Sequence, residues 1–187
     1  MARAGLSAER LTLAAAELAD EIGFDNVTVS AVARRFGVKD ASLYSHIRNA
    51  HDLRVRVALL ALAELADHVA DALAGRAGKD ALTAFANAYR DYARAHPGRY
   101  AAGRLRLDPD TAAASAGPRH SAMTRAILRG YDLPDAEQVH AVRLLHSTFH
   151  GFVSLESAGG FDHSGDVAAS WDRALDALDA TLRNWPR

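Results

Sequence analysis

The stretch VTVSAVARRFGVKDASLYSHI, residues 27–47, decides the fold of the N-terminal part of the chain. Thr28 is a good N-cap for a short helix over about 29–36, and Gly37 supplies the turn that ends it. A second short helix is predicted over about 40–46. Two short helices joined by a glycine-containing turn are typical of a helix-turn-helix, whose second helix enters the major groove of DNA.

The second of these helices is too polar to be an ordinary core helix. Only Leu43, with Val38 and Ile47 at its flanks, can seat it on its neighbours. Its outer face is small and hydrogen-bonding, which suits close approach to base edges. We predict that the bases are faced by Asp40, Ala41, Ser42, Ser45 and His46. We predict that phosphates are contacted by Thr28, Arg34, Arg35, Lys39, Tyr44 and Arg48.

Charge is distributed unevenly, although the formal net charge of the chain is only −1. Residues 1–29 carry two basic side chains, Arg3 and Arg10, against five acidic ones. Residues 30–56 carry six basic side chains against two acidic ones. The predicted helix-turn-helix therefore lies in the most basic part of the N-terminal third, as expected of a surface that meets a polyanion.

Composition excludes several other classes of protein. Apolar residues make up 49% of the 187 residues and charged residues 24%, so the chain is expected to be globular. There is no cysteine, which excludes disulfides, thiolate metal sites and cysteine nucleophiles and fits a cytoplasmic protein. The longest apolar run, 57–63, is too short to span a bilayer, and the N-terminus lacks the apolar core of a secretion signal. No membrane partner and no cofactor are expected.

The periodicity of apolar residues predicts an all-α protein of about nine helices. The first helix runs from the N-cap Ser7 to Gly23. Longer helices are predicted over about 52–74, 80–96, 119–130, 135–157 and 166–184. The apolar face of the 52–74 helix rotates along its length, which suggests contact with two bodies in succession. We therefore expect a helix-turn-helix domain over 1–52 and a larger helical domain over 53–187.

The last helix carries a narrow apolar seam with alternating spacings of four and three residues. Its members are Trp171, Leu175, Leu178, Leu182 and, at the end, Trp185. Such a seam packs either inside one chain or against a second copy. We assign Trp171, Leu175, Leu178 and Leu182 to a dimer interface and leave the intrachain alternative open.

The N-terminal pattern resembles that of TetR-family transcriptional regulators. The resemblance rests on VTVSAVARRFGVKDASLYSHIRNAHDL (27–53) and extends upstream through LAAAELADEIGFDNVTV. HPGRYA (96–101) and LHSTFHGFVSLESAGGF (145–161) are similar to ligand-domain landmarks of one subgroup. The sequence differs from the usual pattern at Lys39, where a capping serine or threonine is common, at Ala50, where lysine is common, and at His146, where tryptophan is common.

The resemblance implies a homodimer in which each N-terminal domain reads one operator half-site. It also implies that an unidentified small molecule in the C-terminal domain alters the spacing of the two reading heads. The expected function is therefore a DNA-binding transcriptional regulator, in particular a repressor released by its ligand. The alternatives are a helical dimeric adaptor or sensor without DNA binding, and an enzyme, for which no nucleophile elbow or phosphate loop is present.

Aromatic residues suggest where such a ligand binds. Phe85, Tyr89 and Tyr92 share one helix face, and Tyr100 follows soon after. The stripe is consistent with plain core packing or with the lining of an apolar cavity. By similarity of location we add Met123, Ile127, His146, Phe149 and His150. His146 and His150 have the i, i+4 spacing of two metal ligands, but no third ligand is evident, so a pocket or interface role is preferred and no metal is expected.

Overall fold

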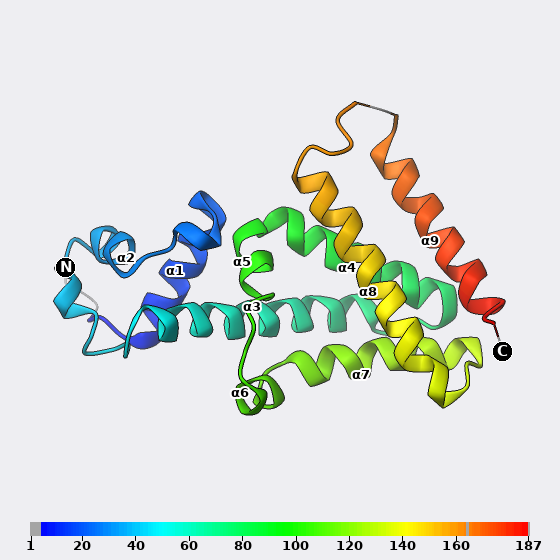
Figure 1. Ribbon diagram of the computed structural model, residues 1–187, viewed down its shortest axis with the longest axis horizontal. Helices are drawn as coiled ribbons and strands as arrows, with labels where there is room; N and C mark the ends of the chain where they lie inside the picture. The colour runs from blue at the N-terminus through cyan, green and yellow to red at the C-terminus, as the bar shows by residue number, and fades with distance from the viewer. Residues whose placement is uncertain (1–4, 164, 187) are drawn as a thin grey trace. The chain divides into compact units, whose positions relative to one another are not determined.

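The computed structural model describes residues 5–163 and 165–186, so Arg3 and the other residues of 1–4 lie outside the described part. Within those ranges nine α-helices and three short 3-10 helices form the fold, and no strand occurs (Figure 1). The predicted all-α class is confirmed. No helix in the described ranges is both long enough and apolar enough to cross a membrane.

The helices follow one another along the chain with short connections. The α-helices are α1 (Ala8–Ile22), α2 (Val29–Phe36), α3 (Ala50–Leu73), α4 (Gly78–Ala95), α5 (Pro97–Ala102), α6 (Pro109–Ala114), α7 (Gly117–Leu128), α8 (Asp135–Ser157) and α9 (Val167–Arg183). The 3-10 helices are η1 (Phe24–Asn26), η2 (Asp40–Ser42) and η3 (Arg129–Tyr131).

Local capping explains where α1 and α2 begin and end. Ser7 and Thr28 are their N-caps, and each side-chain oxygen accepts a hydrogen bond from the backbone N–H three residues later. Gly23, at φ 85°, and Gly37, at φ 66°, end the two helices in backbone conformations that favour glycine. All four positions agree with the predictions from sequence.

The chain forms two compact units, each with its own core. The first consists of Met1–Glu64 and Ala95–Ala116, of which 5–64 and 95–116 are described. Its core is built mainly from α1, α2 and the start of α3, and Ala102 of α5 is buried in it. The second unit consists of Leu65–Arg94 and Gly117–Arg187, and its core joins the remainder of α3 and α4 to α7, α8 and α9.

These units differ from the predicted division between residues 52 and 53. Packing places 53–64 and 95–116 with the N-terminal helices. Residues 53–64 join the first unit because Leu53 and Val57 are buried in its core, and residues 95–116 join it because α5 approaches α1 very closely. A Cβ atom added at Gly98 would lie 2.0 Å from the carbonyl carbon and oxygen of Ala19 and 2.5 Å from the amide nitrogen of Asp20. Only glycine permits this approach, because the obstructing atoms are backbone and cannot turn aside.

Candidate nucleic-acid interface

The helix-turn-helix is held together by a few buried apolar side chains. After Gly37 the chain turns sharply, and the Val38 N–H donates to the Ala33 carbonyl. Leu43 and Ile47 are both buried in the core of the first unit. They anchor the segment that follows α2, as the sequence predicts, and leave its polar side chains outside.

The second element of the motif is shorter and less regular than predicted. Instead of a helix over 40–46, the structure has the 3-10 helix η2 at Asp40–Ser42 followed by a turn through residue 46. Lys39 stands at the N-cap, where no side-chain hydrogen bond caps the element. Without a cap, and with few strong helix formers, this segment keeps i→i+3 bonding before the Ile47 N–H reaches the Leu43 carbonyl.

Most of the predicted base-facing residues lie on the solvent side of this element. Asp40, Ala41, Ser42 and Ser45 are exposed, and His46 is half-buried. Tyr44, predicted to contact phosphate, is 52% exposed although it is a large aromatic residue. The Ser45 hydroxyl donates to the Ser42 carbonyl, and an Asp40 carboxylate oxygen accepts a hydrogen bond from Ser30 Oγ on α2. The exposed side of this segment is therefore mainly small and polar, apart from the ring of Tyr44.

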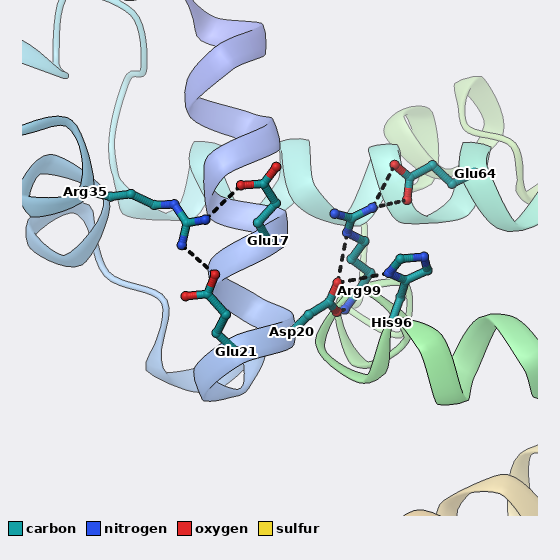
Figure 2. A network of polar contacts seen from close by, with 7 residues as sticks. All are labelled: Glu17, Asp20, Glu21, Arg35, Glu64, His96 and Arg99. Carbon is teal, nitrogen blue, oxygen red and sulfur yellow. Dashed lines mark hydrogen bonds and ion pairs between the residues drawn. The ribbon is translucent and has the colours of Figure 1, made fainter.

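The basic side chains separate into an available set and an engaged set. Arg34 and Lys39 are exposed and make no side-chain hydrogen bond or ion pair with the residues that the structure describes. Arg35 reaches back to α1, where its guanidinium lies 2.9 Å from a Glu17 carboxylate oxygen and 2.7 Å from one of Glu21 (Figure 2). The hydrogen bond that Arg35 donates to Glu21, followed by the charges of both carboxylates, raises the pKa of Arg35 above its usual value.

A second engaged group lies at the start of α3. Asp52 is almost fully buried and accepts the backbone N–H of Arg48. The guanidinium groups of Arg48 and Arg56 lie 3.2 Å and 3.1 Å from its oxygens. Burial by itself raises the pKa of Asp52, but these hydrogen bonds outweigh it and lower the pKa below the usual range. Arg48 nevertheless keeps an exposed side chain.

Helix α1 also carries an ion-pair network toward α5. Asp20 accepts the Arg99 backbone N–H at 2.9 Å, and its carboxylate lies 3.1 Å from Arg99 Nε and 3.2 Å from His96 Nδ1. Arg99 Nη1 also lies 3.2 Å from both carboxylate oxygens of Glu64. Figure 2 shows that Arg35 and Arg99 approach α1 from opposite sides. Helix α1 therefore contacts both α2 of the helix-turn-helix and α5 through charged groups. No local sequence pattern indicated these contacts.

The second unit brings four of the nine predicted ligand residues together in one ring cluster. The rings of Phe85, Tyr89, His146 and Phe149 form one cluster with centroids 6.0–6.5 Å apart. His146 Nε2 lies 3.1 Å from the hydroxyl of buried Thr124, a residue that the sequence reasoning did not select.

The other predicted ligand residues have different surroundings. Ile127 and Tyr92 are buried in the same core, Met123 packs against it, and His150 lies 3.2 Å from Ser154 Oγ. Tyr100 lies on α5, in the first unit, and is not part of this cluster.

An open groove that the sequence reasoning missed also lies in the second unit, between α3 and α4. Its volume is about 510 Å³, and its lining includes His68, Arg76, Lys79, Thr83, Asn87 and Asp91. Nowhere in the described part of the chain do three or more potential metal ligands converge.

The assignment of the α9 seam to a dimer interface needs correction. Trp171, Leu175, Leu178 and Leu182 are all buried in the core of the second unit. The ring of Trp171 packs against Phe152, with centroids 4.8 Å apart, and its Nε1 donates to Asn87 at 2.7 Å. The intrachain alternative therefore describes these four side chains, which have no surface left for a partner. The same spacing is produced by packing within one chain, so the pattern could not distinguish the two cases.

Comparisons with known proteins agree with the architecture of both units. Residues 11–54 match the family described as bacterial regulatory proteins, tetR family. Residues 82–178 match the tetracyclin repressor-like C-terminal domain. Among solved structures, a protein of unknown function from Rhodococcus sp. RHA1 superposes with a TM-score of 0.80 at 23% identity, covering 98% of this chain and 99% of that one.

Two relatives are similar to this chain in sequence over most of its length. The uncharacterized HTH-type transcriptional regulator Rv0681 of Mycobacterium tuberculosis is 36% identical, over 92% of this chain and 80% of its own. The uncharacterized HTH-type transcriptional regulator YobS of Bacillus subtilis is 30% identical, over 90% of this chain and 88% of its own. Together with the exposed helix-turn-helix, these matches show that the chain belongs to the TetR family and is a DNA-binding transcriptional regulator, not an enzyme.

Proposed function

We propose that this regulator is a homodimeric repressor that leaves its operator when a small molecule binds to the second unit. The observation that carries the proposal is the polar surface of η2 and the following turn, seated by buried Leu43 and Ile47. A surface element that exposes small polar groups above a fixed apolar base suits a major groove. An adaptor without DNA binding has no use for it.

The contacts to DNA divide between backbone and bases. Arg34, Lys39, Tyr44 and Arg48 are exposed and fit phosphate contacts. Thr28 belongs with them, since its oxygen accepts a backbone N–H while its hydroxyl proton remains available. Arg35 is reassigned to holding α2 on α1. Asp40, Ala41, Ser42, Ser45 and His46 face the bases, and the DNA-reading part of the first unit ends near residue 52.

Dimerisation is proposed through α8 and α9, as expected from sequence, but through other residues. The exposed large apolar side chains of α8 are Val139, Leu144 and Leu155, which are 42%, 36% and 53% exposed. These residues can be buried by a second copy without disturbing the core, whereas the α9 seam cannot. A two-fold pair of chains would then present two reading motifs to two operator half-sites.

The effector is proposed to bind at the aromatic cluster formed by Phe85, Tyr89, His146 and Phe149. Rings of this kind bury apolar surface, while His146 and Thr124 provide hydrogen-bonding groups. Two structures of the same fold were solved with small molecules, ActR of Streptomyces coelicolor with (S)-DNPA and TetR-Q116A of Acinetobacter baumannii with minocycline. A partly aromatic effector and action in the cytoplasm follow as parts of the proposal.

The test is footprinting of the full chain on the DNA that flanks its own gene, followed by titration of the protected duplex. A protected two-fold symmetric site, whose occupancy falls on addition of an aromatic compound from a panel, is the expected result. Protection that no compound releases would remove the ligand-responsive part of the proposal. Absence of any protected site, with DNA affinity independent of sequence, would remove the operator as well.

A further inference from the structure

Asp40 occupies an unusual position for an acidic residue. It is the only carboxylate between residues 26 and 51, in the most basic window of the first unit. It is exposed at the start of η2, on the surface proposed to meet DNA. A negative charge at this place lowers the attraction to every DNA sequence alike, because phosphates surround the groove. A role in affinity therefore does not account for this residue.

The side chain of Asp40 is held by another element. It does not cap the N-terminus of η2, which has no side-chain cap. Its Oδ2 accepts a hydrogen bond from Ser30 Oγ, on the first turn of α2. The flanking residues Val29 and Ala31 are buried, so the serine itself is fixed. Asp40 Oδ1 has no hydrogen-bond partner in the described part of the chain, and Asp40 is exposed, so one acceptor of a held carboxylate is left for an outside donor.

A fixed carboxylate distinguishes the bases by their chemistry. An ionised carboxylate only accepts hydrogen bonds. In the major groove cytosine offers the N4 amino group, whereas guanine offers the acceptors N7 and O6 and thymine offers the acceptor O4 and a methyl group. Adenine has an N6 donor beside the acceptor N7, so a carboxylate that approaches adenine meets a repelling lone pair as well. Cytosine is the base that fits.

We infer that Asp40, held in place by Ser30, selects a cytosine at one position of each operator half-site by accepting a hydrogen bond from its N4 amino group. Ser30 is a positioning residue, since it acts through Asp40. The inference rests on the proposed function, in which the surface of 40–46 meets the bases. It adds the sequence preference that this surface enforces.

The experiment measures the base preference of the full chain at every operator position. Duplexes carry each of the four base pairs, changed symmetrically in both half-sites, and are titrated at one fixed salt concentration. For the unsubstituted protein, replacing the selected cytosine is expected to weaken binding roughly tenfold per half-site, within the range known for specific base contacts.

Variants at Asp40 and Ser30 identify the residues responsible. Asp40→Ala is expected to abolish the preference at that single position and to leave the other positions unchanged. Asp40→Asn, which keeps the shape, is expected to shift the preference toward adenine, the base that asparagine reads. Ser30→Ala should weaken the preference, with cytosine still the preferred base. Ser30→Thr, which keeps the hydroxyl, should retain the full preference. Asp25→Asn is the matched control, since Asp25 is an acid on the same unit whose side chain is 93% exposed and pairs with Arg54.

The outcomes separate this inference from the proposed function. If Asp40→Ala and Asp40→Asn strengthen binding to all duplexes by one common factor and leave the base profile intact, Asp40 only repels phosphates and the inference is wrong. That result leaves sequence-specific operator binding standing. If the unsubstituted protein shows no base preference at any position, the proposed operator function fails together with the inference. The thermal midpoint of each variant verifies that the first unit is folded.

Discussion

Arg34 and Arg35 are neighbours on α2, yet the structure predicts opposite consequences for their loss. Arg34 is exposed and makes no ion pair with the described residues, whereas Arg35 is engaged by Glu17 and Glu21. Replacing each arginine in turn by glutamine removes the same charge from adjacent positions. The pair of variants therefore separates a phosphate contact from an ion pair inside the first unit, and each variant is the control of the other.

The magnitude for Arg34→Gln follows from counterion release. Each neutralised phosphate contributes about 0.9 to the slope of log affinity against log salt, so a dimer with two reading heads should lose about 1.8. At about 0.15 M salt this corresponds to about 1 kcal/mol per contact and about 2 kcal/mol per dimer, a roughly 30-fold weaker complex. The loss should be similar for specific and non-specific duplexes, because phosphates carry no sequence information.

Arg35→Gln should behave differently. The salt slope should stay close to that of the unsubstituted protein, because the Arg35 guanidinium already has two carboxylate partners. The thermal midpoint of the first unit should fall instead, since α2 loses its charged connection to α1. Fluorescence anisotropy over a salt series and thermal unfolding measure the two effects. An unchanged slope in Arg34→Gln, or an equal loss of slope in both variants, would refute the division into available and engaged cations.

Three further predictions concern the rest of the chain. Gly98→Ala should lower the free energy of unfolding in urea by about 3 kcal/mol, because its Cβ meets the α1 backbone, whereas Gly103→Ala, with no contact closer than 3.6 Å, should cost less than about 1 kcal/mol. Glu156→Gln breaks the bidentate pair with Arg90, which lowers the pKa of Glu156 in the folded chain. The expected loss of about 3 kcal/mol at pH 7 should shrink as the pH falls below about 4.5, because the carboxyl of the unfolded chain is protonated first, and should disappear once the folded carboxyl is protonated as well. Equal losses at pH 7 and pH 3 would contradict this reasoning. In sedimentation Leu144→Asp should give a folded monomer, while Leu178→Asp should unfold the second unit; a dimer that survives Leu144→Asp would exclude this face of α8.

The helix-turn-helix could be predicted from the sequence because its capping residues act locally. Thr28 and Gly37 act within one helical turn of themselves, so their capping roles are visible in the sequence and agree with the structure. The scarcity of apolar residues around Leu43 likewise predicted an exposed polar surface. Only the regularity of this element was overestimated. An uncapped start at Lys39 leaves a 3-10 turn where a helix was predicted.

Other properties of the chain depend on residues distant in sequence. The count of six basic side chains over 30–56 overstates the positive charge available to DNA, because Glu17 and Glu21 of α1 form ion pairs with Arg35. The spacing from Trp171 to Leu182 is the same whether the seam meets its own chain or a second copy, and packing made it intrachain.

By itself, therefore, the sequence determined the helical class, the family and the polar face that follows Gly37, since each depends on short-range patterns of capping and polarity. Tertiary structure alone decided which charges remain available, that α5 packs on α1 through Gly98, and which apolar stripe is left exposed. The physical reason is that the spacing of apolar residues along the sequence shows which residues share one face of a helix. The partner of that face is chosen only when segments far apart in the chain come together.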